Sequence, residues 1–167
     1  MKTPEAAEEL AKAMVEIGNL AGRKMTAVIT NMDTPLGINI GNILEVKEAI
    51  EVLKGGGPAD LRYVCIELAR YMYASCFDVS IDDSREKVLD AIASGAAFEK
   101  LKAMVVAQGG DVAYIENPSL FEESKYRHEI ICKEDGYIYS MNAEAVGIAS
   151  VVLGAIFSVK RIATKKA

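Results

Sequence analysis

Apolar residues recur three and four positions apart over most of the chain, which is the spacing of one face of an α-helix. The first such stretch follows Thr3, which can cap a helix with Pro4 in its first position, and it ends near Gly22. One side of this helix is an apolar stripe of Leu10, Ala13, Met14, Ile17 and Leu20. We expect that stripe to pack against a neighbouring element.

A second helix is predicted where Asn42 is followed three residues later by Glu45, which has the form of a capping box. This helix begins at about Ile43 and continues until the glycines at 55–57. Pro58 opens the next helix. Its predicted buried face consists of Leu61, Val64, Cys65, Leu68, Ala69 and Met72.

Two more helices are expected after a turn around Asp82 and Asp83. Gly95 separates them, and Gly109 with Gly110 ends the second.

Residues 145–159 carry almost no charge, and Asn142 can cap a helix there. A buried core helix is the favoured interpretation, because the stretch is short for a membrane span. A membrane anchor is the alternative, and sedimentation with membranes would test it.

Three short runs have the character of β-strands. Residues 25–30 form an apolar run that suits a strand buried on both faces of a parallel sheet. Residues 128–132 and 137–141 flank a turn triplet at 134–136, which predicts a hairpin. The sequence therefore predicts an α/β fold, with helices packed on a partial, mainly parallel sheet and a short β-rich C-terminal segment with one helix. We expect a boundary near Glu122.

Composition narrows the function classes. The net charge of −5 leaves no basic excess, so we expect no nucleic-acid partner. Three cysteines without a CxxC pair argue against a disulfide framework and favour a reducing cytoplasm. The acidic start lacks the apolar stretch of a secretory signal. A cytoplasmic protein without a membrane partner is the expectation.

Few residues suggest catalytic chemistry. His128 is the only histidine and has no partner at ligand spacing, so a structural role is expected. The glycine clusters at 55–57 and 109–110 could cradle a phosphate, although turns are the favoured interpretation. The loop and helix at 35–48 are more informative. Backbone carbonyls around Leu36 and Asn39, with the carboxylate of Glu48, could hold a weakly bound monovalent cation. From the residues alone, however, the favoured interpretation is that Glu48 lies on a solvated helix face.

Three longer motifs carry a family resemblance: residues 31–37 (NMDTPLG), 41–50 (GNILEVKEAI) and 54–61 (KGGGPADL). Together they closely resemble the pyrimidine-nucleoside phosphorylase and thymidine phosphorylase family. The likeness continues through residues 94–95, 107–111, 136–138 and 148–155. It thus spans nearly the whole chain.

The resemblance implies an enzyme of reversible phosphorolysis, which converts uridine or thymidine and phosphate into a free base and a pentose 1-phosphate without an organic cofactor. The family's phosphate loop and base-binding residues precede the matching segment, so no catalytic or substrate-binding residue has a counterpart here. The family's potassium site does have one: the carbonyls of Leu36 and Asn39 and the side chain of Glu48. Asn39 replaces a residue that is usually small, and the family completes the site from the phosphate loop.

In family terms, residues 1–121 correspond to part of the α/β domain, residues 122–155 to the start of the C-terminal domain, and residues 156–167 to a divergent basic tail. Loss of the resemblance after Ala155 suggests a truncated or frame-shifted gene. The first functional hypothesis is a phosphorylase fragment that is inactive alone. The alternative is a non-catalytic module that complements a separately encoded N-terminal half, or that self-associates as a homodimer.

Overall fold

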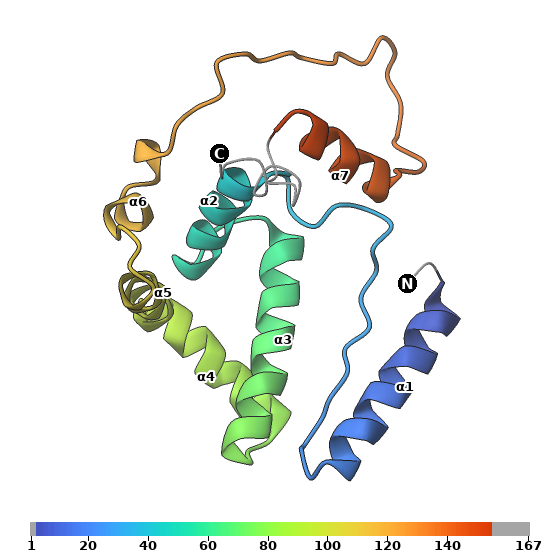
Figure 1. Ribbon diagram of the computed structural model, residues 1–167, viewed down its shortest axis with the longest axis vertical. Coiled ribbons are helices and arrows are strands. Elements are labelled where there is room, and N and C mark those ends of the chain that lie inside the picture. The colour runs from blue at the N-terminus through green and yellow to red at the C-terminus, as the bar shows by residue number, and fades with distance from the viewer. Residues whose placement is uncertain (1–2, 155–167) are drawn as a thin grey trace, which may run out of the picture.

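The computed structural model describes residues 3–154, in which all regular secondary structure is helical and long irregular segments join the helices (Figure 1). The last residues of the predicted core helix and the basic tail lie outside this range. The elements are α1 (Pro4–Leu20), α2 (Asn42–Leu53), α3 (Ala59–Phe77), α4 (Ile81–Ala93), α5 (Ala96–Ala107), α6 (Ala113–Glu116), the 3₁₀ turn η1 (Pro118–Leu120) and α7 (Ala143–Val152).

The predicted α/β fold with a mainly parallel sheet is wrong for this chain. Residues 25–30, 128–132 and 137–141 are extended, but no strand or bridge is present in the described part of the chain. The predicted hairpin and β-rich segment are therefore absent too, and 122–141 instead forms a long arc away from the helices (Figure 1). The physical reason is that a strand is completed by hydrogen bonds to a neighbouring strand, and no such neighbour lies beside these runs.

Most helix boundaries follow the predicted local signals. The Thr3 hydroxyl accepts a hydrogen bond from the Ala6 N–H at 3.2 Å, and Pro4 occupies the first turn of α1. Asn142 caps α7 by accepting from the Ala145 N–H at 2.9 Å. The turn predicted around Asp82 and Asp83 lies slightly earlier, because Ser80 caps α4 and both aspartates belong to its first turn.

Of the helices that the structure describes, α3 and α4 make the most extensive contact with each other, and α5 contacts both α4 and α2 (Figure 1). Among residues 3–154 the buried apolar residues are few: Ile50, Val52, Ile66 and Ile115. Lys102 on α5 binds Glu99 at 2.8 Å and Glu116 on α6 at 3.1 Å, which ties α6 to this group. The packed centre of the chain is therefore the α2–α6 region.

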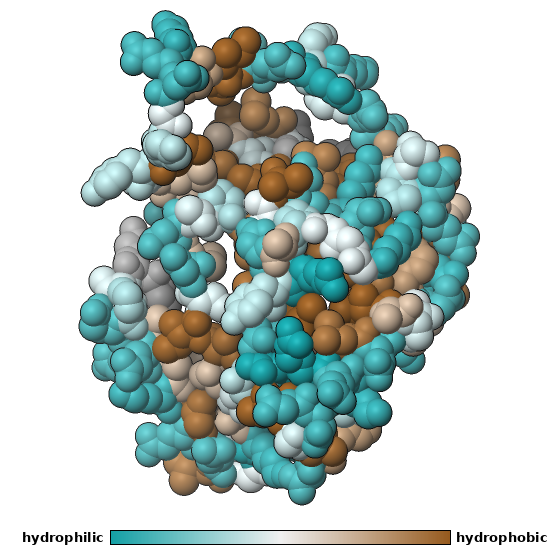
Figure 2. Space-filling model, turned by 180° about the vertical axis from the view of Figure 1, so that it is seen from behind, coloured by the Kyte–Doolittle hydropathy of each residue, from teal (hydrophilic) through white to brown (hydrophobic). Residues whose placement is uncertain are grey.

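Several helix faces that were predicted to be buried are exposed to solvent. The stripe on α1 is exposed, from 46% at Leu10 to 82% at Leu20. On α3, Cys65 and Met72 are also exposed, and α7 is largely exposed instead of forming a core helix. Figure 2 shows apolar side chains gathered in open patches around hollows. Within residues 3–154 no helix is both long and apolar enough to cross a membrane.

Candidate functional site

The best-organised polar cluster lies where the loop before α2 folds back on that helix. Glu48 on α2 is buried, with 6% of its surface exposed. Its Oε1 atom accepts hydrogen bonds from the Ile38 backbone N–H at 3.0 Å and from Asn39 Nδ2 at 2.8 Å. The favoured interpretation from the residues, that Glu48 lies on a solvated helix face, is therefore wrong, because its side chain is buried and its carboxylate accepts hydrogen bonds from the loop.

Gly37 allows this close approach of loop and helix. Its φ of +75° lies in the left-handed region that glycine tolerates. A Cβ atom at this position would lie 2.5 Å from Glu48 Oε2, which is shorter than any ordinary contact. Any larger residue at position 37 would displace the loop or the carboxylate. The second oxygen of Glu48 thus faces the glycine.

Two further carboxylates bind amides of the same loop. Asp60, in the first turn of α3, accepts from the Gly37 N–H at 2.9 Å, and this hydrogen bond is the largest cause of a lowered pKa of Asp60. Glu45 accepts from the Gly41 N–H at 3.0 Å. The predicted capping box is thus half correct: Glu45 reaches back as expected, but Gly41 is the N-cap and α2 already includes Asn42.

The loop is also held from α7. Ser150 is 7% exposed, and its hydroxyl donates to the Ile40 carbonyl at 3.3 Å. A hollow of about 290 Å³ between these elements is lined by Leu36, Asn39, Ile40 and Gly147, among others. A neighbouring hollow of about 520 Å³ is lined by Leu36 and Glu48. The three residues predicted to hold a cation are therefore brought into one neighbourhood.

The chemistry of this neighbourhood suits a hard, weakly charged ion. Among residues 3–154 no lysine, arginine or histidine forms an ion pair with Glu48, although its carboxylate is buried. A buried charge without a countercharge is unfavourable, and carboxylate and carbonyl oxygens are ligands for hard cations. No group of three or more histidine, cysteine, aspartate or glutamate side chains with metal-binding geometry is present in the same range.

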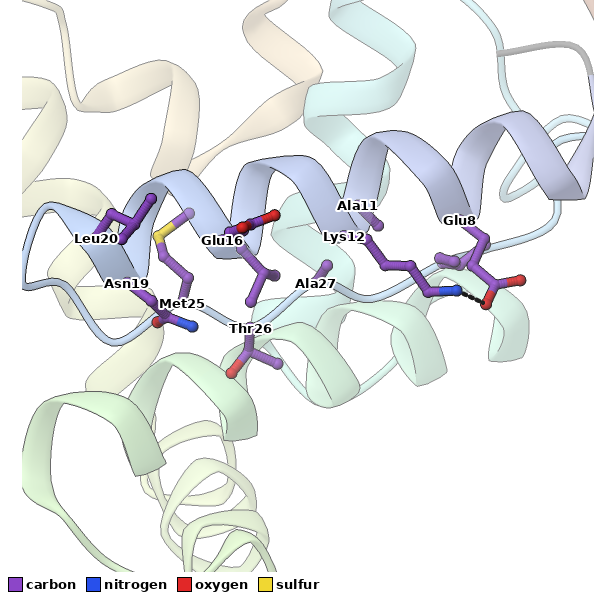
Figure 3. A pocket seen from close by; sticks show the side chains of 11 residues that line it. Glu8, Ala11, Lys12, Glu16, Asn19, Leu20, Met25, Thr26 and Ala27 are labelled. Atoms are coloured by element: carbon purple, nitrogen blue, oxygen red, sulfur yellow. Dashed lines mark ion pairs between the residues drawn. The ribbon is translucent and has the colours of Figure 1, made fainter.

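A second feature is a groove between α1 and the extended residues 25–29, with a volume of about 750 Å³ (Figure 3). Its lining is largely apolar, with Leu20 and Met25 near one end. An ion pair between Lys12 and Glu8 at 2.7 Å lies at the other end and lowers the pKa of Glu8. Between these ends Glu16, Asn19 and Thr26 also line the groove, so it combines apolar surface with polar side chains.

The two glycine clusters do not form phosphate sites. The Gly55 and Gly56 amides donate to the carbonyls of Val52 and Glu51, at 3.0 and 2.9 Å, so they are not free to cradle a phosphate. The amides of Gly109 and Gly110 likewise bond to the end of α5. Both clusters are therefore turns. His128 is exposed in the long arc.

Sequence reasoning missed three contributors to the loop: Asp60, Ser150 and the side chain of Asn39. It treated Asn39 only as a backbone-carbonyl ligand of a cation, whereas the side-chain amide of Asn39 donates a hydrogen bond to Glu48. A signal for Asp60 was available in part, because an aspartate in the first turn of a helix often accepts backbone N–H groups. For Ser150 the sequence contains none, since its partner lies 110 residues away.

Comparison with known proteins agrees with the family resemblance of the motifs. The chain is 45% identical to a pyrimidine-nucleoside phosphorylase of Geobacillus stearothermophilus, 44% to that of Staphylococcus epidermidis and 43% to that of Bacillus subtilis. Each alignment spans 156 residues, which is 93% of this chain and 36% of the relative. The chain thus spans well under half the length of these relatives.

A family model described as the glycosyl transferase family, a/b domain, matches residues 1–98 of the 167. The match includes the whole loop around Glu48 and the helices α1 to α4. The predicted family resemblance is confirmed, and the chain belongs to the glycosyl transferase family through its a/b domain.

Proposed function

We propose that this chain is part of a pyrimidine-nucleoside phosphorylase and that it does not catalyse the reaction by itself. The observation that carries the proposal is the 45% identity to the Geobacillus stearothermophilus enzyme over 93% of the chain. The aligned part is 36% of that enzyme, so most of its residues have no counterpart here. Cytoplasmic location follows from the same proposal.

The proposed reaction transfers a pentose from a pyrimidine base to phosphate. A phosphate oxygen forms a bond to C1′ of the sugar while the bond between C1′ and the base nitrogen breaks. The electron pair of that bond leaves with the base, which takes up a proton. Positive charge develops on the sugar in between, so fixed electrostatics and close positioning of the two substrates lower the barrier.

The contribution of this chain would be to organise a potassium ion beside the substrate-binding elements. The carbonyls of Leu36 and Asn39 and the carboxylate of Glu48 would hold the ion. A bound cation supplies positive charge and fixes the loop. Support comes from the buried carboxylate of Glu48, with which no lysine, arginine or histidine of residues 3–154 forms an ion pair, and from the preference of hard cations for oxygen ligands.

A chimera tests this proposal. Residues 1–154 would replace the aligned segment of the Geobacillus stearothermophilus enzyme, and release of free base from uridine or thymidine with phosphate would be measured. We expect activity from the chimera and none from the isolated chain. A matched Glu48→Gln chimera keeps the side-chain volume but lacks the charge, and it should need more potassium for activity. An inactive but folded chimera, or base release by the chain alone, would contradict the proposal.

A second candidate is a complementing module without activity of its own. The specific observation is the groove between α1 and residues 25–29, together with the exposed α1 stripe. The proposed occupant is a separately encoded polypeptide that carries the part of the relatives missing here. Apolar surface of this extent commonly marks an interface.

Co-expression distinguishes the two candidates. The N-terminal part of the Bacillus subtilis relative would be produced with and without this chain, and complex formation and phosphorolysis would be measured. Ile17→Glu changes the exposed α1 stripe, and Tyr126→Glu is a matched exposed control in the distant arc. Complementation predicts a complex that Ile17→Glu abolishes and Tyr126→Glu retains. Absence of a complex would leave the first candidate alone.

A further inference from the structure

The two oxygens of Glu48 have different surroundings. Oε1 accepts from the Ile38 N–H and from Asn39 Nδ2, which uses the two acceptor positions of a carboxylate oxygen. Oε2 faces Gly37, and no described residue donates a hydrogen bond to it. The carboxylate therefore has one oxygen fixed by the loop and one oxygen left for another partner.

The two hydrogen-bond donors to Oε1 differ in whether a substitution can remove them. The Ile38 donor belongs to the backbone, so every residue at position 38 except proline would supply it. The Asn39 donor is a side chain that only a few residue types could replace. In this contact Asn39 Nδ2 donates and the carboxylate oxygen accepts. The hydrogen bond from Asn39 is thus the one that depends on the residue type.

A neutral amide and a bound cation stabilise the same negative charge by different means. The amide donates to Oε1 and is always present, whereas a cation at Oε2 would come from solution. A cation withdraws charge from the carboxylate and makes Oε1 a weaker acceptor, so the Asn39 hydrogen bond is stronger without the cation than with it. Linkage then requires that Asn39 weaken cation binding by the same factor.

We propose that the Asn39 side chain is a positioning residue that partly replaces the cation at Glu48, so that this loop depends less on potassium than it would with a residue that cannot donate. The inference rests on the proposed cation site. It concerns a side chain, whereas that site uses the Asn39 carbonyl. The role of the Asn39 side chain can therefore be wrong while the cation site is right.

The test measures potassium binding by the full chain without an activity assay. The probe is potassium chloride, titrated against choline chloride at constant ionic strength. Two signals are followed: the NMR shift of the Ile38 amide, which donates to Glu48, and the midpoint of thermal unfolding. The variants are Asn39→Ala, Asn39→Asp and Glu48→Gln. Asn19→Ala, on the exposed surface of α1, is the matched control.

The expected result is tighter potassium binding by Asn39→Ala, roughly fivefold or more, with a lower unfolding midpoint when potassium is absent. Asn39→Asp has the same shape but places a second acceptor against Glu48, so its potassium-dependent rise in midpoint should be the largest. Asn19→Ala should behave as the unchanged chain, and Glu48→Gln should lose the response.

Equal or weaker potassium binding by both Asn39 variants, with a response that Glu48→Gln abolishes, would overturn this inference and leave the cation site intact. Failure of the cation site itself would be detected in the chain without substitutions. If potassium shifts the Ile38 amide no more than choline does, and Glu48→Gln behaves identically, the cation site itself is wrong and the role of Asn39 is rejected with it.

Discussion

Ser150 on α7 donates its hydroxyl to the carbonyl oxygen of Ile40 at 3.3 Å, across 110 residues of sequence. This hydrogen bond joins the last described helix to the loop that carries the candidate site. The same loop is held from α2 by Glu48 and from α3 by Asp60. Elements on three sides therefore determine its conformation.

Replacement of Ser150 by alanine should lower the free energy of unfolding by about 1 kcal/mol, because a mostly buried hydrogen bond is lost. Urea denaturation measures the change. Ser75→Ala is the control, since the Ser75 hydroxyl bonds only to Tyr71 within α3 and is exposed. Equal effects of the two substitutions would show that α7 does not hold the loop.

Gly37→Ala should be more destabilising than Gly109→Ala. The two glycines have nearly the same φ, +75° and +74°, so the backbone strain of an alanine is matched, at about 1–2 kcal/mol. Only at position 37 would the new Cβ meet Glu48, whereas nothing lies within 4 Å at position 109. We expect an additional loss of about 1–3 kcal/mol at position 37. Thermal unfolding of both variants gives the difference.

Asp60 should make stability depend on acid pH. The hydrogen bond from the Gly37 N–H lowers the pKa of Asp60 below its ordinary value of 3.8. A lowered pKa in the folded state stabilises the fold above the ordinary value, and the effect is lost as pH falls through the lower folded value. Asp60→Asn should therefore differ from the unchanged chain at neutral pH and converge with it in strong acid. A carbon-13 NMR titration of the carboxyl group measures the pKa directly, and a difference in stability that does not vary with pH would refute this role.

Backbone amides of residues 25–30 should exchange with solvent almost as fast as those of an unstructured peptide. These residues are extended but have no neighbouring strand in the described structure. The amide of Ile66, buried within α3, should exchange slower by several orders of magnitude. Hydrogen–deuterium exchange with mass spectrometry compares the two, and strong protection at 25–30 would mean that the segment has a partner.

The helices could be predicted because their signals are local. Thr3, Pro4 and Asn142 act on amides within a few residues of themselves, so the sequence contains the whole interaction. Strand formation at residues 25–30 could not be decided in this way, because the required neighbour is not part of the local sequence. The same apolar run is compatible with a buried strand and with an uncovered extended segment.

The candidate site could be predicted only in part, because some of its contacts are not determined by the local sequence. Family motifs selected Leu36, Asn39 and Glu48, and the structure brings these residues into one region. Helical periodicity did not reveal that Glu48 points inward, because its partners lie in an irregular loop. The binding of potassium by this set stays a prediction.

The uncovered run at residues 25–30, Met-Thr-Ala-Val-Ile-Thr, has a consequence for handling the protein. It contains no charge, no proline and no glycine, and β-branched residues make up four of its six positions. Short segments of this kind form cross-β stacks between identical chains when they are exposed. Aggregation of the isolated chain should therefore begin at this hexapeptide, and a lysine in place of Val28 should suppress fibril formation.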